Sequence, residues 1–283
     1  MTDSTNRIEF HQVRDFGEVI TVTFDFIRAN FKPLMKAWLY IVGPFALMSS
    51  LISIYSMDMS SSFSQMFNLA SIANLVLGVY TYYLTYLVTL GYLHFYLQGT
   101  STIEFDRIWL FTKQNFWFFL GQYNVLMLVT FIGFLLFILP GFYLMVVLAI
   151  APVIRIIERL PVLASIKRAR QLVSGFWWRT FGLMIVLLII LAVFSSLLQM
   201  PLYILMFLWT FNNIEAGTLA GSPADDYPIL ALSSVITQAL AVGVNIIPMV
   251  AFSLHYFNLR ERKEAVSLMD KVASLGTNDE PHE

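Results

Sequence analysis

The strongest constraint in this sequence is a series of apolar stretches that are long enough to cross a lipid bilayer as helices. A hydrocarbon core about 30 Å thick requires about 20 apolar residues per helix. Four unbroken stretches meet this length, at residues 34–57, 72–98, 180–210 and 229–258. The chain is 58% hydrophobic and 12% charged, whereas soluble domains carry about 25% charged residues. Lipid is therefore the expected solvent for much of the protein.

A fifth apolar stretch, 122–157, contains Pro140 followed by Gly141, and this pair is a strong turn signal. Two helices at 122–139 and 142–157 would complete six spans arranged as three hairpins. A re-entrant hairpin, which enters the bilayer and returns to the same side, is the alternative. The sequence predicts an all-α polytopic membrane protein with about six transmembrane helices.

The basic residues indicate how this protein is oriented in the membrane. All 17 Lys and Arg residues fall in segments that the predicted topology places on one side of the bilayer, and the opposite connections, 58–71 and 211–228, contain none. Because Lys and Arg concentrate in cytoplasmic loops, both termini are expected to be cytoplasmic. The chain then divides into a cytoplasmic N-terminal segment (1–33), a transmembrane domain (34–258) and a cytoplasmic tail (259–283).

Each predicted hairpin is preceded by a segment whose apolar residues recur at helical spacing, which is typical of an amphipathic helix in the membrane interface. The apolar stripes are Phe16, Ile20, Phe24, Ile27 and Phe31; Phe105, Ile108, Trp109, Thr112 and Phe116; and Ile166, Ala169, Val173 and Phe176. Asp15 and Glu18 have the spacing of a capping box at the start of the first helix. The three helices are expected to end at Asn30, Asn115 and Gly175 on the cytoplasmic face.

The residue types that carry most enzyme chemistry are scarce. The chain has no cysteine and four histidines, and its net charge is −1. The sequence contains no recognisable nucleophile–base set, metal-ligand cluster or phosphate-binding glycine loop. We therefore expect a protein that is not an enzyme, needs no cofactor or metal, and does not bind nucleic acid directly.

Charged residues at the end of the predicted fourth span indicate a structural anchor. Glu158 lies between Arg155 and Arg159, and ionisable groups at membrane depth usually pair. We expect Glu158 to pair with Arg168 or Arg179 and so to position the third amphipathic helix. A solvated surface cluster is the alternative interpretation.

Two further groups of residues are candidate contacts for lipids or ligands. Lys167 and Arg170 belong to a basic cluster with Arg168 and Arg179, and an anionic membrane surface attracts each basic residue by about 1 kcal/mol. The same charges also enforce the topology. Thr81, Thr85 and Thr89 recur every four residues within the second span. They predict either a polar groove or, more often for hydroxylated residues in membrane helices, a helix-packing face.

The stretch Ala151–Glu158 and the segment Ser165–Arg179 that follows resemble the membrane domain of glycerophosphodiester phosphodiesterases and its uncharacterised relatives. That family has a glutamate at the end of a span, a helix of the form Ala-Leu-x-Arg-Ser-x-x-Leu-x-x-Gly, and an aromatic-Trp-Arg entry into the next span. The tail Tyr256–Glu264 is similar to the closing Tyr-x-x-Leu-Arg motif, whereas Ser165 and Ala169 depart from the pattern. The resemblance implies a six-span bacterial inner-membrane module that lacks the catalytic domain.

Two hypotheses for function follow from these patterns. The first is an accessory or scaffold subunit of a larger membrane assembly, whose partner would be another membrane protein. The candidate interaction residues are Phe116, Trp117, Trp177, Trp178 and Arg260, together with Glu158, Arg168 and Arg179. The alternative is the binding or transport of a membrane lipid or another small amphiphile.

Overall fold

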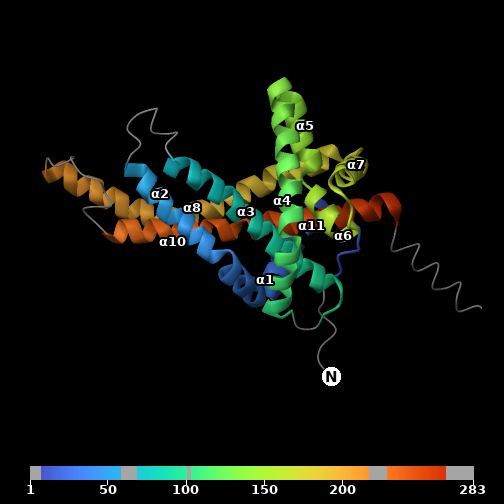
Figure 1. The fold of residues 1–283 in the computed structure, drawn as a ribbon, viewed down its shortest axis with the longest axis horizontal. Coiled ribbons are helices and arrows are strands. Elements are labelled where there is room, and N and C mark those ends of the chain that lie inside the picture. Colours follow the sequence, from blue (N-terminus) through green and yellow to red (C-terminus); the bar gives the residue numbers. More distant parts are fainter. Residues whose placement is uncertain (1–7, 59–68, 101–102, 217–227, 266–283) are drawn as a thin grey trace, which may run out of the picture.

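The computed structural model describes residues 8–58, 69–100, 103–216 and 228–265, and this part of the chain is helical and contains no strand. Its ten helices are α1 (Phe16–Ile41), α2 (Gly43–Asp58), α3 (Leu69–Leu97), α4 (Phe105–Leu136), α5 (Ile138–Leu148), α6 (Ala151–Glu158), α7 (Val162–Val173), α8 (Trp177–Ala216), α10 (Pro228–Val244) and α11 (Ile246–Glu264), shown in Figure 1. The prediction of an all-α fold is confirmed.

The described helices also confirm a multi-pass membrane protein. Five segments are long and apolar enough to cross a membrane: Leu69–Leu97, Phe105–Leu136, Ile138–Glu158, Trp177–Asn212 and Leu232–Glu264. The pair of α1 and α2 provides a sixth if its bend of 56° is counted within one span. The fourth predicted span is made of α5 and α6, and the last is made of α10 and α11.

The junctions between the amphipathic segments and the spans differ from the prediction in two of three places. Both α1 and α4 continue through Asn30 and Asn115, whose side-chain amides donate hydrogen bonds of 2.9 Å to the carbonyls of Phe26 and Phe111. Only the third helix, α7, ends as expected, because Gly175 adopts a φ of +84°, which favours glycine. An asparagine that bonds within its own helix does not terminate it, so the first two amphipathic segments are continuous with membrane helices.

The predicted apolar stripe of the first segment is also not its buried face. The capping interaction is present, since the Asp15 amide donates to the Glu18 carboxylate at 2.9 Å. However, α1 buries the face that carries Val19, Thr23 and Phe26, whereas the stripe that includes Phe16 and Phe31 is partly or largely exposed. The exposed and half-buried stripe residues are Phe16, Ile20, Phe24, Ile27 and Phe31. The helix is apolar on two sides: one side packs on the protein core, and the predicted stripe stays exposed or half-buried.

The α4–α5 hairpin turns earlier than Pro140 and Gly141 suggested. Its turn is at Phe137, which has an extended backbone, and Pro140 lies in the first turn of α5. Gly141 instead allows the two helices to approach each other, because a Cβ atom there would lie 2.8 Å from the Cα atom of Phe134. In Figure 1 this hairpin (green) runs across the direction of α2, α3, α8 and α10.

The last helix, α11, is the most deeply buried part of the structure. All six side chains from Leu254 to Leu259 are buried, and the helix contacts α1, α3, α6, α7 and α8. Figure 1 shows α11 (red) passing among these elements. The N-terminal segment is tied to it, because the Asn258 side chain accepts a hydrogen bond from the Arg14 amide at 3.1 Å and donates one to the Arg14 carbonyl at 2.9 Å. The core of the described structure therefore forms around α11.

The tip of the α4–α5 hairpin has the surface of a segment that is embedded in hydrocarbon. Residues 125–150 carry no charge, and Leu136, Phe137, Ile138 and Leu139 are each 65–81% exposed. Such a turn would be a large apolar patch in water. We therefore expect the tip to end inside the bilayer, which corresponds to the re-entrant alternative rather than to a complete hairpin across it.

The chain has no cysteine, so a single introduced cysteine is labelled at one known position. Its labelling therefore tests whether the tip of the hairpin lies inside the bilayer. We expect a Leu139→Cys variant in sealed membrane vesicles to resist a membrane-impermeant maleimide added from either side. An Asn212→Cys variant, at the exposed end of α8, should react from one side. Both should react after denaturation in detergent. Labelling of Leu139→Cys as fast as Asn212→Cys in intact membranes would show instead that the hairpin crosses the bilayer.

Candidate functional site

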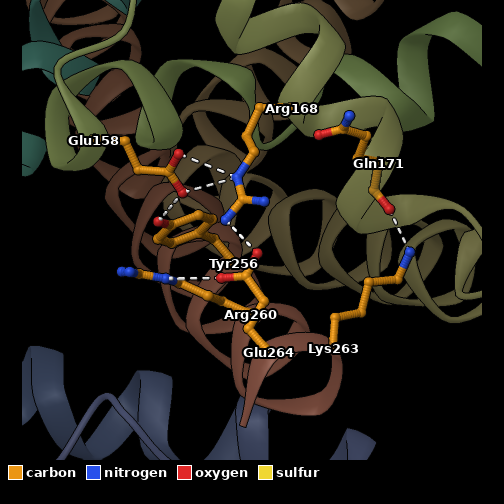
Figure 2. Close-up of polar contacts among 7 residues, drawn as sticks. All are labelled: Glu158, Arg168, Gln171, Tyr256, Arg260, Lys263 and Glu264. Carbon is orange, nitrogen blue, oxygen red and sulfur yellow. Dashed lines mark hydrogen bonds and ion pairs between the residues drawn. The ribbon is translucent and has the colours of Figure 1, made fainter. Parts of the chain in front are cut away.

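Three helices that are separate in the sequence, α6, α7 and α11, meet in a cluster of charged side chains (Figure 2). Glu158 is the last residue of α6, and Arg159 then turns the chain with a positive φ of 53°. The Nε atom of Arg168 on α7 donates to both carboxylate oxygens of Glu158 at 3.1 Å. The hydroxyl of Tyr256 on α11 donates to the same carboxylate at 2.8 Å. Glu158 therefore holds α7 and α11 against the end of α6.

A second carboxylate, that of Glu264, completes this cluster. It lies 2.6 Å from the Nη2 atom of Arg168 and 3.4 Å from the Nε atom of Arg260, one turn earlier on α11. The Nζ atom of Lys263 donates to the carbonyl of Gln171 on α7. Figure 2 shows Arg168 lying between the two carboxylates. Two carboxylates and two guanidinium groups neutralise one another, so the cluster acts as a clamp between helices.

The predicted pairing of Glu158 with an arginine is present, and the structure shows which arginine it is. Glu158 pairs with Arg168, whereas Arg179 is exposed and lies over the ring of Phe176 at 5.7 Å. Burial alone would lower the pKa of Arg168, but hydrogen bonds to Glu264 and Glu158 outweigh it and the pKa is raised. The guanidinium therefore stays charged. Ion pairing of this kind positions helices and is not a catalytic arrangement.

The other predicted interaction residues differ in how far they are exposed. Trp117 and Trp178 are 73% and 76% exposed. Phe116 packs edge-on against Tyr83 with ring centroids 6.1 Å apart, and Trp177 stacks on Phe181 at 5.1 Å. The basic lipid-contact candidates, Lys167 and Arg170, are both exposed on α7.

The threonine stripe of the second span lies in the packed interior of the described structure. Thr81, Thr85 and Thr89 are buried, and each hydroxyl donates to the carbonyl four residues earlier at 2.7–2.9 Å. Thr85 also accepts a hydrogen bond from the Trp38 indole at 3.1 Å. The packing interpretation of this stripe is therefore confirmed, and α1 is the helix that it holds.

An adjacent face of α3 opens onto an apolar groove that the sequence did not reveal. The groove has a volume of about 490 Å³. It is lined by residues of α3, α4, α5, α8 and α11, by Ala149 between α5 and α6, and by Pro152 of α6. Its lining includes Tyr82, Tyr86, Tyr123, Leu126, Ala149 and Leu188. We call it the tyrosine groove. The only signal in the sequence is the spacing of Tyr82 and Tyr86, which places both on one helical face, because the contribution of the hairpin depends on the tertiary structure.

The tyrosine groove contains buried polar atoms as well as apolar surface. The hydroxyl of Tyr86 is fully buried and has no hydrogen-bond partner among the described residues. Tyr82 and Tyr123 lie side by side in the same lining, with ring centroids 6.2 Å apart. The remaining contributors are mostly aliphatic and aromatic, and none of them is charged. This chemistry fits the chain of an amphiphile together with a neutral polar group.

Neither a metal site nor a similarity to known proteins indicates a function for the described residues. Within the described residues, no group of three or more His, Asp and Glu residues is placed to hold a metal ion. The chain matches no model of a protein family, no characterised protein and no solved structure. The resemblance to the phosphodiesterase membrane domain stays a prediction.

Replacing Arg168 tests the clamp, because its guanidinium neutralises both carboxylates. We expect Arg168→Gln to lower the free energy of unfolding by about 1.5–3 kcal/mol, the range for hydrogen bonds to charged groups. Arg170→Gln, on the exposed face of the same helix, should change it by at most about 0.5 kcal/mol. Thermal unfolding in a mild detergent measures both, and equal losses in the two variants would contradict the anchoring role.

Proposed function

We propose that this chain is a non-enzymatic protein of a bacterial inner membrane that binds a lipid or another small amphiphile in the tyrosine groove. The observation that carries the proposal is a groove of about 490 Å³ with an apolar lining and a buried, unpaired tyrosine hydroxyl. Ligand sites are typically concave and apolar with a few polar groups that orient the ligand. The groove makes amphiphile binding the leading hypothesis, ahead of the accessory role that the sequence favoured.

The arrangement of the helices supports an orientation with both termini in the cytoplasm. In Figure 1 the far ends of α2, α8 and the start of α10 lie at one end of the molecule, and α7 and the end of α11 lie toward the other. The described Lys and Arg residues lie on α1 and just before it, in the first part of α4, from α6 to the start of α8, and at the end of α11. Lys and Arg mark the cytoplasmic side of a membrane protein.

The position of the tyrosine groove along α8 also suits a membrane ligand. The groove contacts α8 from Met184 to Leu191. Met184 follows Trp177 by seven residues, or about 10 Å along a helix that rises about 1.5 Å per residue. Trp177 and Trp178 are aromatic residues of the kind that lie at the membrane interface. The groove then lies where acyl chains begin, and a lipid enters it from the side.

Filling the groove tests this function. Ala149 lines it and is partly exposed, whereas Ala192 on α8 is exposed and lies outside it. We expect Ala149→Trp to remove most of the lipid that copurifies with the protein, because the indole occupies the volume of the ligand. The matched Ala192→Trp variant should retain it. Mass spectrometry of the protein purified from native membranes in mild detergent measures the ratio of bound lipid to protein.

The lipid retained by the two variants distinguishes binding in the tyrosine groove from binding elsewhere on the protein. Loss of a lipid class from Ala149→Trp alone supports binding in the groove. Equal lipid retention by wild type, Ala149→Trp and Ala192→Trp would contradict the proposal, because the retained lipid would then lie elsewhere on the surface. Thermal unfolding of both variants verifies that each is folded.

A second candidate function is an accessory or scaffold subunit, favoured by the exposure of Trp117 and Trp178. Exposed tryptophans are common anchors in protein interfaces. We expect the double variant Trp117→Ala with Trp178→Ala to lose a protein partner in affinity purification from native membranes. A control double variant, Phe207→Ala with Phe211→Ala on the exposed far part of α8, should keep it. An unchanged set of copurifying proteins would exclude this interface.

A further inference from the structure

Tyr86 is an exception among the buried tyrosines of this protein. On the same helix, the hydroxyl of Tyr83 donates to the Phe116 carbonyl at 2.9 Å, and that of Tyr92 donates to the Asn30 side chain at 2.8 Å. Tyr256 is paired with Glu158. The Tyr86 side chain is also buried, at 6% exposure, and its hydroxyl has no partner in the described structure. A buried hydroxyl without a partner is costly, so a native protein usually supplies one.

In the described structure, none of the neighbouring polar groups of the groove accepts a hydrogen bond from Tyr86. Tyr82 and Tyr123 are the other hydroxyl-bearing aromatics in the lining, and the Thr130 hydroxyl donates to the Leu126 carbonyl at 2.9 Å. If the three tyrosine hydroxyls rotated to bond one another in an open chain, one of their hydrogens would still have no acceptor among the three, because each hydroxyl has one donor. The groove therefore offers a surplus donor to whatever occupies it.

The surroundings of this donor restrict the chemistry of its acceptor. None of the lining residues is charged, so an ionised phosphate or carboxylate at this depth would be buried without a counter-charge, which is unfavourable. A neutral acceptor carries no such penalty. In a membrane lipid the neutral acceptor nearest the hydrocarbon chains is the ester carbonyl that joins a chain to the glycerol.

The geometry points to an ester-linked glycerolipid as the ligand, with one acyl chain in the tyrosine groove and its ester carbonyl accepting a hydrogen bond from Tyr86. This inference rests on the proposed function and names the ligand class. The charged headgroup stays outside the groove, toward the aqueous face, and contributes nothing to recognition by Tyr86. Tyr86 is then the residue that distinguishes an ester lipid from an ether lipid of the same length.

The test compares two lipids that differ only at the proposed acceptor. The protein is equilibrated in mixed micelles with equal amounts of a diacyl phosphatidylglycerol and its dialkyl ether analogue with matched chains. We expect the wild type to retain the ester lipid roughly three- to tenfold over the ether lipid, the ratio for one net hydrogen bond. Tyr86→Phe should reduce that ratio to about one. Tyr203→Phe, at an exposed site outside the groove, should leave it unchanged.

The outcomes distinguish this inference from the function on which it rests. The wild type could retain both lipids equally while Ala149→Trp displaces both. The groove would then bind lipid without a hydrogen bond from Tyr86 to the ester carbonyl, and the inference would be overturned. If Ala149→Trp displaces neither lipid, the proposed function itself fails. Thermal unfolding in the ether lipid verifies that Tyr86→Phe is folded, because loss of an unpaired hydroxyl should leave its melting temperature unchanged or higher. A melting temperature for Tyr86→Phe well below that of the wild type in the ether lipid would also overturn the inference, since the hydroxyl would then be paired within the protein.

Discussion

The burial of α11 from Leu254 to Leu259 is the interaction on which the other helices depend. The helices α1, α6 and α7 each contact this helix, and polar residues of α11 bind the segment before α1 and the end of α6. Asn258 pairs with the backbone of Arg14, and Tyr256 with Glu158. Since polar groups buried in such a core are satisfied only in one arrangement, these contacts select one packing of these helices.

The clamp between α6, α7 and α11 also explains why the α4–α5 hairpin diverges from the bundle. Because α6 is held at Glu158, the chain from α5 must return to that point. Close approach at Gly141 keeps the hairpin narrow. The hairpin therefore extends across the other helices (Figure 1), and the tyrosine groove is the space left between them.

In the functional site, structural residues and candidate ligand-binding residues occupy separate places. The charged residues balance one another in the clamp, and the threonines of α3 hydrogen-bond within their own helix and with Trp38. The hydroxyl of Tyr86 is left over from this internal pairing. A membrane protein has no water in the hydrocarbon to satisfy such a group, so a lipid is the natural source of its partner.

The sequence by itself determined the solvent, the helical class, the presence of long apolar segments and the pairing of Glu158 with an arginine of the next segment. These properties depend on composition, on 20-residue apolar lengths and on local charge, which are all readable along the chain. Tertiary structure alone decided that Asn30 and Asn115 lie within continuous helices, that α1 buries its Val19 face, and that Arg168 rather than Arg179 binds Glu158. It also created the tyrosine groove, because α8 and α11 must pack against α3, α4, α5 and α6 before their residues line one space.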